Sequence, residues 1–155
     1  PSYESLMAAR DRFVAHHPDL RFVGAHMASL EWNVDRLAAF LAANPRANVD
    51  LAARLSAVQY QSLRDRAKVR GFFIRYAERL MYATDLTYAP DTKPAEFRKE
   101  AHEFWTSDWR YLATADTQHI AALGAEVPGL ELPRAVIDKI YYANARREFV
   151  RRPPR

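Results

Sequence analysis

Three short apolar runs, at residues 21–25, 47–51 and 80–84, are separated by longer segments in which apolar residues recur every three or four positions. The runs read RFVGA, ANVDL and LMYAT, and no pair of them is joined by a two-residue hairpin turn. Short buried strands that alternate with helices are typical of a parallel sheet with crossover helices. The pattern therefore predicts an α/β fold.

Helix start and stop signals surround these runs. Ser2 is predicted to cap a first helix that ends near His16, before Pro18. Further helices are predicted at 34–43, 53–60, 63–76, 95–105 and 133–142. We expect a break near Gly71, because glycine disfavours a helix interior, and a final short helix capped by Asn144. Residues 106–131 show no clear period.

Two of the runs end on polar residues, His26 and Asp85. In parallel α/β folds ligands bind beyond the carboxyl ends of the strands, and in (β/α)8 barrels the catalytic groups come from those ends. His26 and Asp85 are therefore predicted to meet at one rim. The alternatives are a hydrogen-bonded structural histidine and, for the Thr84-Asp85 pair, a helix N-cap.

Asp50 lies one residue before the end of the second run. A hydrogen-bonded structural carboxylate is the favoured interpretation of Asp50, and a third rim residue is the alternative. On each of the other two strands, the residue two before the polar one is small, Gly24 or Ala83, which favours room for a ligand. The aromatic cluster at 104, 105, 109 and 111 is interpreted as packing rather than as a substrate cage.

The net charge of +4 comes from residues 146–155, which contain five Arg and one Glu, while the rest of the chain is balanced. This Arg/Pro tail is interpreted as a solvated end rather than a nucleic-acid site. The chain has no cysteine, no nucleotide-binding glycine motif, no GxSxG motif and no apolar run that could span a membrane. No signal peptide opens it, which favours the cytoplasm, although the compartment stays open.

Five segments, in this order, resemble the C-terminal half of the amidohydrolase-related family: GAHMASLEW (24–32), NVDLAARL (48–55), YATDL (82–86), SDWRYL (107–112) and KIYYANARREF (139–149). This family consists of metal-dependent TIM-barrel enzymes, including aminocarboxymuconate-semialdehyde decarboxylase and related hydrolases. The resemblance implies that residues 1–150 form strands six to eight of a (β/α)8 barrel with their helices. Residues 151–155 are then a basic tail.

The resemblance also implies roles for three residues. Asp85 matches the eighth-strand aspartate, which binds or borders a divalent metal, usually zinc, and handles the proton of the attacking water. His26 matches the sixth-strand histidine, a metal ligand in some members and an acid–base or substrate-polarising group in others. Arg54 follows the seventh strand and is expected to hold a substrate carboxylate or phosphate. The expected reaction is hydrolysis or decarboxylation of a small carboxylate, amide or ester.

The family's HxH motif on strand one and its ligands on strands four and five have no counterpart in the sequence. A catalytic zinc site normally has about three protein ligands, and a complete barrel has about 250 residues. We therefore expect a piece of a longer enzyme, inactive alone, with a non-catalytic interaction module as the alternative. Because three parallel strands leave open edges, the remainder of the barrel or a homo-oligomer is the expected partner.

Overall fold

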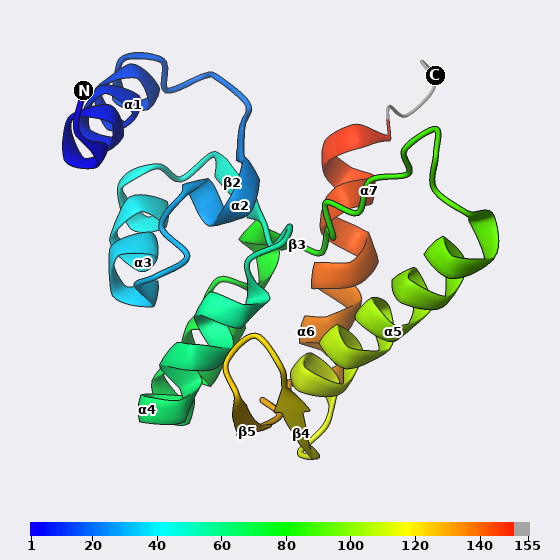
Figure 1. Ribbon diagram of the computed structural model, residues 1–155. Coiled ribbons are helices and arrows are strands. Elements are labelled where there is room, and N and C mark those ends of the chain that lie inside the picture. The colour runs from blue at the N-terminus through cyan, green and yellow to red at the C-terminus, as the bar shows by residue number, and fades with distance from the viewer. Residues whose placement is uncertain (151–155) are drawn as a thin grey trace, which may run out of the picture.

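The computed structural model describes residues 1–150, so the predicted basic tail at 151–155 lies outside the described residues. Helices and strands alternate over the first half of the chain, as expected for an α/β protein (Figure 1). The elements in chain order are α1 (Tyr3–His16), β1 (Phe22–Gly24), α2 (Ala25–Ala28), α3 (Val34–Ala43), β2 (Ala47–Asp50), α4 (Leu55–Arg75), η1 (Ala77–Arg79), β3 (Leu80–Met81), α5 (Pro94–Ala113), β4 (Thr117–Ile120), β5 (Ala125–Pro128), α6 (Arg134–Asp138), η2 (Lys139–Ala143) and α7 (Asn144–Phe149).

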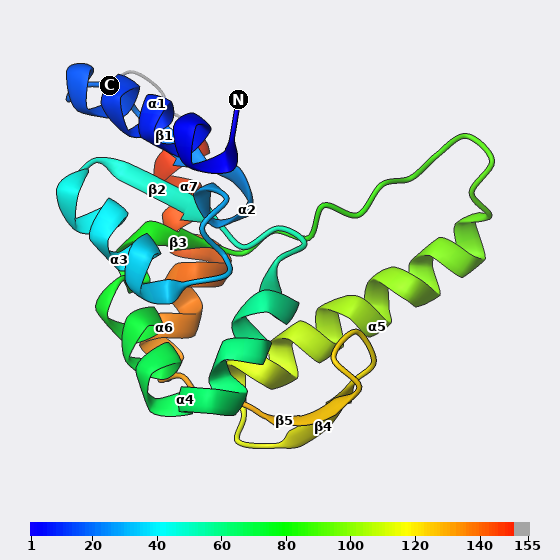
Figure 2. The ribbon, with the colours of Figure 1, turned by 60° about the vertical axis from the view of Figure 1, so that its left-hand side comes forward.

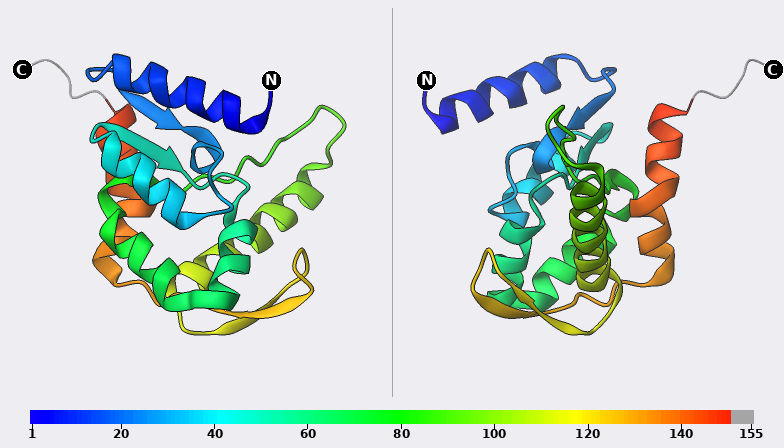
Figure 3. Two further views of the ribbon diagram at one scale, coloured as in Figure 1. Left: turned by 90° about the vertical axis from the view of Figure 1, so that its left-hand side faces the viewer. Right: turned by 45° about the vertical axis from the view of Figure 1, so that its right-hand side comes forward.

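The central sheet has the strand order β1-β2-β3, and both pairs are parallel. Phe22 pairs with Ala47, and Val49 pairs with Leu80, so the carboxyl ends of the three strands lie at one edge. Figure 3 shows the strands side by side, with α1 across one end of the molecule. The predicted α/β class and the parallel strands are therefore confirmed.

Helices α1 and α3 begin at side-chain caps. The Ser2 hydroxyl accepts a hydrogen bond from the Ser5 N–H, as predicted, and the Asn33 side chain accepts from the N–H groups of Asp35 and Arg36. These bonds satisfy backbone donors that a helix leaves unpaired at its start. The fully buried side chains of α3, β2 and α4 then meet in the core; they include Leu37, Val49, Val58 and Phe73.

The third strand is shorter than predicted, because only Leu80 and Met81 pair with β2. The next residue, Tyr82, donates its backbone N–H to the carbonyl of Ile140 in η2 at 2.8 Å instead of extending the ladder. From there the chain leaves the sheet in a long loop and returns through α5 (Figure 2). The C-terminal helical segment thus takes the place of a further strand pairing at Tyr82.

The two helices predicted at 53–60 and 63–76 correspond to the two parts of α4, which meet at a break. Helix α4 runs from Leu55 to Arg75, and its backbone breaks at Asp65 (φ −151°, ψ 82°) rather than near Gly71. The Asp65 carboxylate accepts a hydrogen bond from the Lys68 N–H at 2.9 Å, which is the geometry of an N-cap. The expected break near Gly71 is therefore wrong, since a capping residue decides its place.

Residues 106–131, where the sequence shows no helical or strand periodicity, contain the end of α5 and an antiparallel hairpin. Helix α5 continues to Ala113, well past the predicted end at 105, and β4 pairs with β5 from Thr117–Pro128 to Ile120–Ala125. The sequence of β4, TQHI, lacks an alternation of apolar and polar residues, and most of its side chains are exposed or partly exposed. The hairpin packs between α4 and α5 at the side of the molecule away from α1 (Figure 1).

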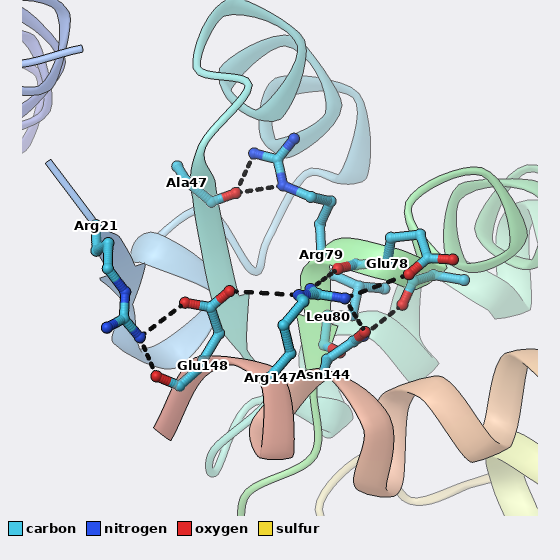
Figure 4. A network of polar contacts seen from close by, with 9 residues as sticks. Arg21, Ala47, Glu78, Arg79, Leu80, Asn144, Arg147 and Glu148 are labelled. Carbon is cyan, nitrogen blue, oxygen red and sulfur yellow. Dashed lines mark hydrogen bonds and ion pairs between the residues drawn. The ribbon is translucent and has the colours of Figure 1, made fainter. Parts of the chain in front are cut away.

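The C-terminal helical segment is continuous, so the prediction that Asn144 caps a separate helix is wrong. Asn144 has helical backbone angles, and η2 just before it is a π-helical turn. Its buried side chain instead donates hydrogen bonds to the carbonyls of Ala77 (2.6 Å) and Leu80 (2.8 Å), as Figure 4 shows. Together with Arg147, which donates to Glu78, it fastens α7 to the segment that enters β3.

Arg79 performs a similar task between β3 and β2. Its guanidinium donates to the carbonyl of Ala47 (Figure 4) and to that of Asn44. Burial lowers the pKa of the guanidinium. Within residues 1–150, no helix combines the length and the apolarity that crossing a bilayer requires.

Candidate functional site

A left-handed turn follows β1 and carries the first candidate residue. His26, Met27, Ala28 and Ser29 all have φ between 54° and 57°. Residues other than glycine pay roughly 1–2 kcal/mol each for that conformation, so contacts elsewhere hold the turn. A Cβ on Gly24 would lie 2.6 Å from the Ala28 Cβ. The small residue at 24 therefore admits the turn, and the interpretation that it leaves room for a ligand is wrong.

Asp50, at the end of β2, holds this turn. Its Oδ1 accepts the backbone N–H of His26 at 2.8 Å and that of Ala52 at 3.2 Å. A carboxylate that accepts two backbone N–H groups joins the end of β1 to the end of β2. The favoured interpretation of Asp50 as a structural carboxylate is confirmed.

The His26 ring is fixed through one nitrogen. Its Nδ1 lies 2.9 Å from the carbonyl oxygen of Ala52. Because a carbonyl only accepts hydrogen bonds, Nδ1 carries the hydrogen. In the neutral ring Nε2 is then the acceptor with a free lone pair, which is the form that binds metals or takes up a proton.

The structure brings His26 and Asp85 together. Nε2 of His26 lies 3.8 Å from Oδ2 of Asp85, and about a third of the His26 side chain and over half of the Asp85 side chain are exposed (32% and 58%). The distance is beyond hydrogen-bond range. In the neutral ring, two electron-pair donors thus face one another at the carboxyl edge of the sheet, with space for a shared cation or water.

Asp85 lies in the loop after β3 and also has left-handed backbone angles (φ 62°). It is not an N-cap, because the next helix begins at Pro94 with Lys93 at its cap position. The Thr84 hydroxyl accepts the Leu86 N–H, which closes a turn around Asp85. The N-cap alternative for the Thr84-Asp85 pair is therefore wrong.

The pair fits part of a metal site. An imidazole nitrogen and a carboxylate oxygen are ordinary zinc ligands at about 2.0–2.2 Å, and atoms 3.8 Å apart can share one ion at those distances. Among residues 1–150, however, no group of three or more His, Cys, Asp or Glu side chains is placed to hold a metal. His26 and Asp85 could thus supply two ligands, and a catalytic site needs at least one more.

Arg54 is paired with an acid rather than with the two candidate residues. Its Nε lies 3.4 Å from Oε1 of Glu31, and Oε2 of Glu31 is buried without a hydrogen-bond partner in the described part of the chain. Arg54 lies two residues after Ala52, whose backbone carbonyl accepts the hydrogen bond from the His26 ring. Its role in substrate binding stays a prediction.

A buried acid that the sequence interpretation did not single out is Asp108, on α5. Its Oδ2 accepts the hydroxyl of Tyr82 at 2.9 Å, and Tyr82 stacks on Tyr141 with ring centres 4.3 Å apart. Burial raises the pKa of Asp108 to about 6, against the lowering effect of the Tyr82 hydrogen bond. Burial also raises the pKa values of both tyrosines.

The sequence signal that could have identified Asp108 as buried is its position on the helix. It falls on the same face of α5 as Ala101, Tyr111 and Leu112, all of which are buried. An acidic residue on the apolar face of a helix is a buried acid, and such acids are candidates for function. Of the aromatic cluster, Tyr111 is fully buried, whereas Trp105 and Trp109 are exposed by 50% and 43%.

The fold and the His26–Asp85 pair define an α/β protein with a histidine and an aspartate beyond the carboxyl ends of its parallel strands. The family model described as amidohydrolase matches residues 4–150. The chain therefore belongs to the amidohydrolase family, which indicates a metal-dependent hydrolase type of function. Neither the curated proteins nor the solved structures include a significant match to it.

Proposed function

We propose that the protein is a metal-dependent hydrolase or decarboxylase in which His26 and Asp85 form part of the catalytic centre. The observation that carries this proposal is the 3.8 Å approach of His26 Nε2 to Asp85 Oδ2, with Nδ1 of the same ring bound to the Ala52 carbonyl. That bond orients the free lone pair toward the carboxylate. Family membership supports the same class of reaction.

A divalent metal bound by His26 and Asp85, zinc by preference, would lower the pKa of a bound water to about 7. Asp85 is the more exposed of the two groups, so it can accept the proton of an attacking water and orient that water. His26, with its ring fixed through Nδ1, would supply Nε2 as the other ligand, and the metal would then polarise the substrate carbonyl or carboxylate. Arg54 is proposed to hold a substrate carboxylate or phosphate once it is released from Glu31.

Strands β1 to β3 are proposed to correspond to three strands of a (β/α)8 barrel, the sixth to the eighth. Their parallel order and the placement of polar groups at one edge support this. The missing ligands would come from other barrel strands, either in the remainder of the barrel or in a second copy of the chain. Light scattering combined with size-exclusion chromatography tests the second copy, which predicts a dimer.

The test of the centre is metal binding measured by titration calorimetry with Zn²⁺. His26→Gln and Asp85→Asn are each expected to abolish the binding of the intact protein, because each removes one of two ligands. His119→Gln is the matched control, since its Nδ1 pairs with Glu126 on the exposed hairpin. Zn²⁺ affinity that is unchanged in both variants would rule out the proposed centre.

The incomplete ligand set favours one alternative, a non-catalytic half-barrel that serves as an interaction module. Two ligands rather than three among residues 1–150 is the observation behind it. In that case the folded protein binds no Zn²⁺ and shows no hydrolase or decarboxylase activity. Metal-dependent activity that Asp85→Asn abolishes would exclude the module.

A further inference from the structure

A cavity of about 220 Å³ lies between α4, α5 and the β4–β5 hairpin. Its apolar wall includes Leu55, Phe104 and Ile120. Since a water molecule occupies about 30 Å³ in the liquid, the cavity is large enough for a small organic group. It also borders Ala53, the residue after the carbonyl that fixes His26.

Two buried polar side chains line the cavity with unused hydrogen-bonding capacity. Asp108 is only 7% exposed, and among residues 1–150 its Oδ1 has no hydrogen-bond partner while Oδ2 accepts from Tyr82. Gln59 is 3% exposed, and its side-chain amide makes no hydrogen bond within the same residues. Neither residue is among those whose polar atoms are fully buried without a partner in the described chain, so the unbonded Asp108 oxygen and Gln59 amide keep some accessible surface. Both residues line the cavity, where a ligand can reach these atoms.

The charge of Asp108 is also uncompensated. No Lys, Arg or His nitrogen of the described chain forms an ion pair with it, and burial disfavours its ionised form. An unpaired buried carboxylate costs several kcal/mol unless a cation or hydrogen-bond donors reach it. A positively charged group in the cavity would supply both.

We propose that this cavity binds a small organic ammonium group, with the Asp108 carboxylate as its counter-charge and the Gln59 side-chain carbonyl as a second acceptor. Leu55, Phe104 and Ile120 contact the carbon atoms attached to the ammonium group. The assignment of this ligand as the amine end of a substrate rests on the proposed function. Binding to the cavity does not, because it requires neither metal nor turnover.

The experiment titrates the full chain with propylammonium chloride and with 1-propanol, followed by ¹H–¹⁵N correlation spectra. The two probes have the same shape and differ in charge. We expect saturable shifts around residues 55–59, 104–108 and 120–122 with propylammonium, and binding of 1-propanol that is about tenfold weaker or more. Equal affinity for both probes, or no saturable shift, would overturn the proposal.

Asp108→Asn keeps the shape of the side chain and removes its charge, so it is expected to weaken propylammonium binding about tenfold or more. The matched control is Asp116→Asn, an exposed residue between α5 and β4 outside the cavity. It removes the same charge and is expected to leave the affinity unchanged. Equal losses in both variants would indicate a general charge effect and refute the site, independently of Zn²⁺ binding at His26 and Asp85.

Discussion

The Asp50 carboxylate accepts the backbone N–H of His26 at 2.8 Å and so holds the first residue of a left-handed turn. We predict that Asp50→Ala lowers the free energy of unfolding by about 1–3 kcal/mol, because two half-buried N–H groups lose their acceptor. It should also weaken Zn²⁺ binding, since the His26 ring loses its fixed position. Urea denaturation and calorimetry measure the two effects.

Asp19→Ala is the control for Asp50→Ala. Its carboxylate pairs with Arg46 at 2.9 Å, but its side chain is almost fully exposed, and exposed ion pairs contribute little. If Asp50→Ala lowers the free energy of unfolding as little as this control does, the left-handed turn does not depend on the carboxylate.

Substitution of Asn144 is also predicted to lower the stability of the fold. Replacement by Ala, which removes the amide without adding bulk at this buried position, leaves the carbonyls of Ala77 and Leu80 without their amide donor, at a cost of about 1–3 kcal/mol. Thermal unfolding should show the loss. Asp138→Ala, which removes an exposed partner of Arg134, should change the stability far less; the reverse ranking would contradict the role of Asn144.

Asp108 predicts a specific dependence of stability on pH. In the folded protein it keeps its proton up to about pH 6, whereas in the unfolded chain it releases it near the ordinary pKa of 3.8. Raising the pH between those values therefore favours unfolding. Asp108→Asn should be close to wild type at pH 4 and more stable than wild type at pH 8, by up to about 3 kcal/mol.

The quantity to measure for Asp108 is the difference in unfolding free energy between variant and wild type at each pH. The contributions of all other titrating groups cancel in this difference. A difference that stays constant from pH 4 to pH 8 would contradict the raised pKa of this carboxyl.

Gly71→Ala is predicted to stabilise the protein by about 1 kcal/mol, since alanine is the better helix former. Gly71 lies inside α4, and a Cβ there meets no atom within 4 Å. Gly24→Ala is the contrasting variant, because its Cβ would collide with Ala28. Chemical denaturation should rank the two on opposite sides of the wild type.

Local patterns were enough to predict the parallel strands and the polar residues at their ends. Apolar runs and helical periods are properties of neighbouring residues, and His26 and Asp85 follow directly from where the runs stop. The left-handed turn at His26 was not predictable, because a carboxylate on another strand holds it. The break in α4 was misplaced, since the capping hydrogen bond of Asp65 outweighs the low helix propensity of Gly71.

The hairpin and Asp108 escaped prediction for different reasons. The sequence of β4, TQHI, has one buried residue, so its pairing depends on β5 and on packing beside the helices. Asp108 was overlooked because the helix around it was expected to end at 105, before the acid. With the full length of α5 known, its place on the buried face follows from helical spacing alone.

The π-helical turn at Lys139–Ala143 gives the C-terminal segment one more residue per turn than an α-helix needs. A deletion of one residue within it can be absorbed by conversion to an α turn, whereas a deletion of one residue in α6 would rotate the last turn by about 100° relative to the sheet. The amide at position 144 would then point away from the two carbonyls it now serves. We therefore expect length changes in α6 to be far less tolerated than the loss of one residue from the π turn.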